Sequence, residues 1–119
     1  MLREYEVEVS DFDTMQALLT RLGFVVTLRY EKYRETFVYD GAKLLLDEVP
    51  FGAFLEIEGP RDAIRAVATK LGLDFAARLT ASYGEIFDAV CSHYCLPCTD
   101  LTFAQFQGVH VDLRACQLT

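Results

Sequence analysis

Basic residues are scarce in this chain. It has 11 Lys and Arg against 18 Asp and Glu, which gives a formal net charge of -7 and a pI of about 4.7. Duplex nucleic acid is bound through basic surface that displaces counterions, so the composition excludes nucleic acid as the expected partner. A smaller polyanion can still bind where the few basic groups are concentrated or where a metal ion intervenes.

Long apolar runs and familiar catalytic motifs are also lacking. No stretch approaches the roughly 20 apolar residues that cross a bilayer, so no membrane partner is expected. Residues 1–4 do not lead into the apolar segment of a signal peptide, and we therefore expect a cytoplasmic protein whose four cysteines are thiols. The sequence also contains no glycine-rich phosphate loop and no Ser-His-Asp order.

The hydrophobic pattern predicts one small domain of mixed strands and helices. At 119 residues, 52% hydrophobic and 24% charged, the chain is too apolar for general disorder and long enough for a small core. Period-two alternation, helical spacing, helix caps at Ser10 or Asp11 and at Ser82, and the Asp40-Gly41 turn divide it into elements. The expected strands are 2–9, 24–39 with a break near 31–35, 43–49, 52–59 and 109–111, and the expected helices are 12–22, 60–71 and about 83–93.

The strand expected at 52–59 has two unlike faces. Successive residues of a strand point to opposite sides, so Glu56 and Glu58 share one face with Phe54 while Leu55 and Ile57 share the other. The apolar face is expected to pack on a core. The two carboxylates lie roughly 6–7 Å apart along the backbone and repel each other unless water, a cation or basic side chains neutralise them.

The charged residues on the other expected strands also gather on shared faces, and two interpretations are open. One is a solvated outer face of the sheet. The other is a charged cavity in which carboxylates hold a divalent cation and basic side chains hold an anion, a combination that binding of a metal-phosphate requires. The residues concerned are Glu4, Glu6, Glu8, Lys32, Arg34, Asp47, Glu56 and Glu58.

Several short segments occur in an order and spacing that resemble one family. They are 3–9, 22–24, 31–35, 46–49, 52–59, 71–73 and the pair Ser82-Tyr83. As a set they resemble the CYTH superfamily, which contains class IV adenylate cyclases, thiamine triphosphatases and the wider triphosphate tunnel metalloenzymes. The resemblance extends from residue 1 to about residue 90 and favours the charged cavity.

The resemblance implies a fold and a set of site residues. The fold is an antiparallel β-tunnel with a triphosphate and a divalent cation, Mg²⁺ or Mn²⁺, inside. Asp47, Glu56 and Glu58 match positions that bind the metal in the family. Lys32 and Arg34 match the basic pair that grips the triphosphate and serves catalysis. The acidic strand that contains Glu4 and Glu6 is expected to contribute to substrate binding.

The chain departs from the family pattern at its first strand. The family begins with an E-x-E-x-K strand, but Glu8 or Ser10 stands where the lysine is expected, and the match is better to a strand in the middle of the family pattern. The resemblance is therefore mainly to the C-terminal half of the tunnel. We expect an α+β half-barrel over 1–90 with flanking helices, followed by an extension over 91–119. Open strand edges favour closure by a homodimer or by a partner that supplies the missing half, although a truncated, inactive remnant is the third reading.

Two function classes follow. The first is a metal-dependent enzyme that hydrolyses or cyclises a triphosphate, with nucleoside triphosphate, thiamine triphosphate and tripolyphosphate as the possible substrates. The second is a non-catalytic half-domain that binds polyphosphate or nucleotide, or that pairs with another subunit. The retained basic pair favours the enzyme, whereas the missing E-x-E-x-K strand favours the binding module.

A cysteine cluster lies in the expected extension. Its C-x3-C-x2-C spacing is used by radical enzymes to hold an iron-sulfur cluster, and nearby histidines allow a zinc site instead. We favour incidental thiols, because this spacing is weak without its structural context. The residues are Cys91, Cys95 and Cys98, with His93, His110 and Cys116 as further candidate zinc ligands.

Overall fold

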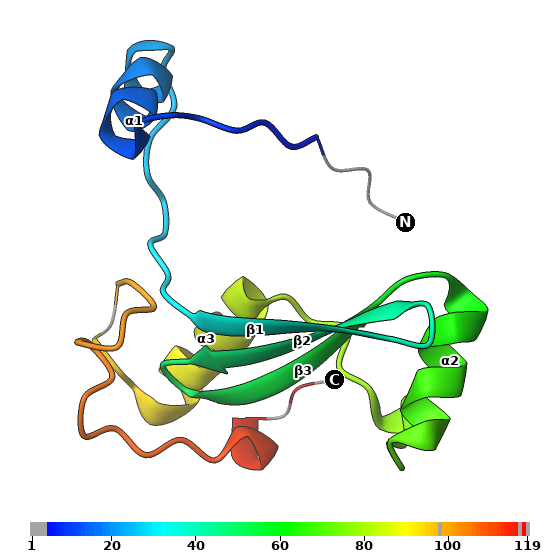
Figure 1. Cartoon of the computed structure of the whole chain (residues 1–119). Coiled ribbons are helices and arrows are strands. Elements are labelled where there is room, and N and C mark those ends of the chain that lie inside the picture. Colours follow the sequence, from blue (N-terminus) through cyan, green and yellow to red (C-terminus); the bar gives the residue numbers. More distant parts are fainter. Residues whose placement is uncertain (1–4, 98, 117, 119) are drawn as a thin grey trace.

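The computed structural model describes residues 5–97, 99–116 and 118. Its centre is an antiparallel sheet with strand order β1-β2-β3 (Figure 1). The strands are β1 (Tyr33–Tyr39), β2 (Ala42–Val49) and β3 (Gly52–Glu58). The helices are α1 (Phe12–Arg21), α2 (Arg61–Lys70) and α3 (Tyr83–Tyr94), and the two 3-10 turns are η1 (Phe75–Ala77) and η2 (Leu113–Cys116). The α+β class is thus confirmed, and the three-stranded sheet remains open rather than closed into a tunnel.

Local signals in the sequence place most of the element boundaries. Asp40 and Gly41 have φ values of +47° and +78°, as a tight hairpin turn requires, and they set the register in which Tyr39 pairs with Ala42. The Asp11 carboxylate accepts the Thr14 N–H at 2.9 Å and begins α1. The caps and the turn expected at these positions are therefore confirmed.

The third helix begins at a complete capping box. The Ser82 hydroxyl accepts the Glu85 N–H at 3.3 Å, and the Glu85 carboxylate accepts the Ser82 N–H at 2.7 Å. This confirms the expected start of α3 and fixes the position of Tyr83, the first residue of the helix, above the sheet.

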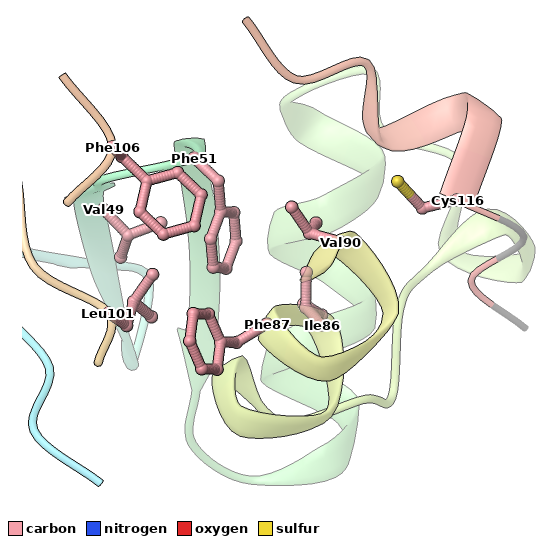
Figure 2. Packing of buried hydrophobic residues seen from close by; sticks show 8 residues of the cluster. All are labelled: Val49, Phe51, Ile86, Phe87, Val90, Leu101, Phe106 and Cys116. Carbon is pink, nitrogen blue, oxygen red and sulfur yellow. The ribbon is translucent and has the colours of Figure 1, made fainter. Parts of the chain in front are cut away.

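The hydrophobic core lies between α3, the turn from β2 to β3 and the C-terminal segment (Figure 2). Ile86 and Val90 of α3 are fully buried, and so is Leu101 beyond it. Phe51 stands edge-on to Phe106, with ring centroids 6.1 Å apart. Residues on both sides of position 90 thus form one core, although the domain boundary expected there remains a prediction.

Three expected strands are absent from the part of the chain that the structure describes. Residues 5–9 run outside the sheet, 24–31 form only an isolated bridge between Tyr30 and Leu101, and 109–111 form no ladder. The reason is physical: alternation makes a segment suitable for a sheet, but a strand forms only where a neighbouring edge supplies hydrogen-bond partners.

The orientation expected for β3 is reversed. The sequence predicts that Leu55 faces the core, yet Leu55 is exposed. Instead, Phe54 on the other face of β3 packs edge-on against Phe51 and Tyr83, at ring-centroid distances of 5.7 and 5.3 Å. Helix α3 covers the face of the sheet that carries Phe54, Asp47 and Glu56. The charged face is therefore the inner one.

Candidate functional site

Three side chains from the three strands meet on the inner face of the sheet. Arg34 of β1 stands directly opposite Asp47 of β2, and Asp47 stands opposite Phe54 of β3. Glu56 lies two residues further along β3, so it shares that face and is diagonal to Asp47. The register of the sheet thus brings together one guanidinium and two carboxylates.

The Arg34 guanidinium binds Asp47 through two parallel contacts. Its Nε donates to Oδ1 and its Nη2 to Oδ2, both at 2.6 Å, and Nη2 also donates to Glu56 Oε2 at 3.2 Å. Asp47 is only 1% exposed, and a buried carboxylate is stable only when it is paired and hydrogen-bonded. The two-pronged geometry supplies that pairing and fixes the orientation of the guanidinium.

The Arg34 contact lowers the pKa of Asp47 to about 2, against the opposing effect of burial and with help from Tyr83 and Lys32. The same pairing raises the pKa of Arg34. Asp47 is therefore an anion at neutral pH, and its negative charge is compensated within the site.

A pH titration should detect this carboxylate. Because the pKa of Asp47 is lower in the folded chain than its usual value of 3.8, its contribution to stability is fully present above about pH 4 and is lost as the pH falls through about 2. The shift corresponds to about 2 kcal/mol in the free energy of unfolding. Urea unfolding measured from pH 5 to pH 2 should show this loss. If the free energy of unfolding of the native protein falls with pH no more steeply than that of Asp47→Asn, the result contradicts the prediction.

Tyr83 completes the environment of Asp47. Its hydroxyl donates to Asp47 Oδ2 at 2.7 Å, and burial first, with the neighbouring carboxylate second, raises its pKa. Sequence reasoning did not assign Tyr83 to the site, although Ser82-Tyr83 was part of the resemblance. The capping box at Ser82 was the available signal, because it sets where α3 begins and hence where Tyr83 points.

Lys32 adds a second positive charge beside the pair. Its Nζ lies 3.8 Å from Asp47 Oδ2 and 5.5 and 5.8 Å from the ring centroids of Tyr83 and Tyr30. Both rings face the ammonium at cation–π distance. The side chains of Lys32 and Arg34 are 24% and 31% exposed, so a ligand can reach both cations.

The predicted site residues are not all brought together. Lys32, Arg34, Asp47 and Glu56 are assembled as described, and Glu58 is exposed at the end of β3 on the same face as Glu56. Glu6 lies in the exposed segment before α1, outside the sheet, and Glu4 falls outside the described residues. The expected role of Glu4 and Glu6 in substrate binding therefore remains a prediction.

The carboxylates fit a divalent cation only in part. Among the described residues, no group of three or more His, Cys, Asp or Glu side chains is placed to hold a metal ion. Asp47 does not suit this role as it stands, because both its oxygens accept hydrogen bonds from Arg34 and Tyr83. Glu56 and Glu58 suit a cation such as Mg²⁺ that takes one or two carboxylates and completes its shell with phosphate and water.

The cysteines that the structure describes form no group placed to hold a metal ion. Cys91 lies on α3, Cys95 ends that helix in the left-handed conformation, and Cys116 is buried in the core, where desolvation raises the pKa of its thiol. Cys98 falls outside the described residues. Metal binding by these cysteines remains a prediction.

A cavity of about 590 Å³ adjoins the charged residues. It runs beside β3 and is lined by Phe54, Glu56 and Glu58 of that strand, by Phe75 of η1 and by Tyr83 of α3. Glu56 and Tyr83 therefore belong both to this cavity and to the charged site.

In the parts of the chain that the structure describes, no helix is long and apolar enough to cross a membrane.

The α+β fold, with its open antiparallel sheet and charged inner face, is compatible with half of a CYTH-type barrel. The family model for the CYTH domain matches residues 2–79, more than half of the chain, and the protein belongs to this family. The match lies in the N-terminal part of the chain and does not bear out the expectation of a likeness mainly to the C-terminal half of the tunnel. No curated protein and no solved structure matches the chain.

Proposed function

We propose that this protein binds a triphosphate at the inner face of its sheet through Lys32 and Arg34. The observation that carries the proposal is the guanidinium of Arg34, held by a buried carboxylate yet partly exposed beside a second cation. A guanidinium suits two phosphate oxygens at once, whereas an ammonium supplies a point charge. Membership of the CYTH family supports a triphosphate as the anion.

Catalysis at phosphorus is the favoured activity. Lys32 and Arg34 would hold the charge that grows on the phosphate oxygens in the transition state, and Asp47 with Tyr83 would keep Arg34 oriented. Glu56 and Glu58 would hold Mg²⁺ or Mn²⁺, which supplies charge neutralisation and polarises the phosphate when bound. Water as the nucleophile gives a triphosphatase, and a ribose hydroxyl gives a cyclase.

A non-catalytic binding or pairing module is the second candidate. It is favoured by the near balance of charge in the site, where Asp47 and Glu56 already accept hydrogen bonds from Arg34. An incoming phosphate must compete with these carboxylates. A homodimer or a partner that supplies the missing half of the tunnel would add the basic groups that a single chain lacks.

Ligand-induced stabilisation tests binding of the triphosphate, and analysis of the products then separates an enzyme from a binding module. Tripolyphosphate or ATP with Mg²⁺ or Mn²⁺ should raise the melting temperature. At a ligand concentration of 100 times Kd, the free energy of unfolding should increase by about 2.7 kcal/mol. Arg34→Ala and Lys32→Ala should remove this stabilisation, whereas Arg61→Ala, at the start of α2, should keep it. Phosphate release that depends on Lys32 identifies the hydrolase, and conversion of ATP to a cyclic product identifies the cyclase. Unchanged melting with every triphosphate would refute the proposal.

A further inference from the structure

The N-terminal arm, defined as residues 5–22, has apolar surface without a partner in its own chain. Helix α1 has no buried residue, and its apolar stripe includes Phe12 and Leu18, which are 76% and 55% exposed, while Leu22 just after the helix is 75% exposed. The arm, drawn in blue, stands apart from the sheet (Figure 1). The radius of gyration is 16.8 Å, whereas a compact chain of this length has about 13.5 Å.

The free edge of β3 offers a place for an added strand. Among the described residues, β3 pairs only with β2, so its other edge presents unpaired backbone groups. The cavity of about 590 Å³ runs along this edge from Phe54 to Glu58 and is also lined by residues of α2, η1 and α3. An extended segment can enter such a groove and bond to the edge, as in strand addition by peptides.

The outer face of the sheet carries large apolar side chains that are exposed. Phe37, Leu46 and Leu55 on this face are 50%, 49% and 38% exposed, and Leu46 stands directly opposite Leu55. Three large side chains from three neighbouring strands form a patch of the kind that marks an interaction site. A helix with one apolar stripe covers a face of this kind.

The sequence of the N-terminal arm suits both the free edge of β3 and the outer face of the sheet. In the segment before α1, Tyr5, Val7 and Val9 alternate with Glu6 and Glu8, so an added strand would present one apolar and one acidic side. Placed beside β3, its apolar side continues the row of Leu55, and its acidic side continues the row of Glu56. The helix that follows is then positioned over the outer face.

The position of the arm points to a second copy as the occupant. Residues 29–31, which lead into β1, are fixed against Leu101: the Arg29 carbonyl accepts the Leu101 N–H at 2.8 Å, and the Glu31 N–H donates to the Leu101 carbonyl at 2.9 Å. The arm thus leaves its own chain at the β1 side, and the free edge of β3 is at the opposite side of the sheet.

We propose that the β3 edge and the outer sheet face of one chain bind the N-terminal arm of a second copy, in a reciprocal exchange that forms a symmetric dimer. Such an exchange makes two identical contacts and leaves neither arm unpartnered. The inference rests on apolar surface and on strand edges, so it holds whether or not the protein binds a triphosphate. The two acidic rows brought together repel, and we therefore expect added salt to strengthen the dimer.

Light scattering on the full chain tests this proposal. The native protein should have twice its monomer mass of 13.5 kDa at high concentration and should dissociate on dilution. Leu18→Asp places a charge in the apolar stripe of both arms and should raise the dissociation constant roughly 100-fold. Ala17→Asp adds the same charge on the opposite side of α1 and should leave the mass unchanged.

A second pair of variants tests the receiving surface. Leu55→Asp on the outer face should weaken the dimer as Leu18→Asp does, whereas Ala66→Asp, which adds the same charge at an exposed position of α2 away from the sheet, should not. Circular dichroism confirms that each variant is folded. A native chain of monomer mass at every concentration, or a dimer that resists both aspartate substitutions in folded protein, would overturn the proposal.

Discussion

Asp47→Asn should destabilise the protein by about 2–3 kcal/mol, among the largest effects expected of any single substitution at the site. Asparagine has nearly the shape of aspartate, but it removes the buried negative charge that Arg34 binds through two short contacts and leaves the guanidinium only its longer contact to Glu56. Removing one partner of a buried ion pair typically costs about 3–5 kcal/mol, and the partial exposure of Arg34 reduces that figure. Urea unfolding at pH 7 measures the difference.

The matched control for this substitution is Glu48→Gln. Glu48 is the next residue of β2, but it is exposed and lies on the other face of the sheet, so its loss should change the stability by less than about 0.5 kcal/mol. Equal effects at Asp47 and Glu48 would show that burial of the pair on the inner face does not govern its energy.

Leu101→Ala should have an effect of similar size far from the charged residues. Leu101 is fully buried and packs in the same core cluster as Phe87 and Phe106, so truncation removes about 2–5 kcal/mol of stability by loss of burial and creation of a cavity. Thermal and urea unfolding should both report the loss. The result would establish that the segment after α3 is part of the folded core.

Leu79→Ala is the comparison for this second substitution. Leu79 is 46% exposed and lies outside the core cluster, so its truncation should cost well under half as much. A small effect of Leu101→Ala, comparable to that of Leu79→Ala, would mean that residues beyond 94 contribute little to the stability of the domain.

The sequence predicted those elements whose signals are local. Asp11 marks the start of α1, Asp40-Gly41 the hairpin, and Ser82 with Glu85 the start of α3, because each signal acts within a few residues of itself. No strand formed at 5–9, in the first part of the expected 24–39 strand or at 109–111, for the opposite reason. A strand forms only beside the edge of another strand in the fold, and the alternation of apolar and polar residues does not show whether such an edge exists.

The candidate site divides in the same way. Alternation correctly put Arg34, Asp47 and Glu56 on shared faces of their strands, and the resemblance chose them as site residues. The pattern did not show which face α3 would cover, so the inner and outer faces of β3 were exchanged. The contact between Tyr83 and Asp47 joins residues 36 positions apart and has no counterpart in local sequence.

Packing of α3 on the charged face of the sheet has a consequence for the evolution of this chain. In most amphipathic sheets the core and the working surface are opposite sides, and either can drift without the other. Here Phe54 and Tyr83 contact the core and line the charged site at once. A substitution that improves packing under α3 will therefore tend to alter the environment of Asp47, so selection on stability and selection on binding act on the same few positions.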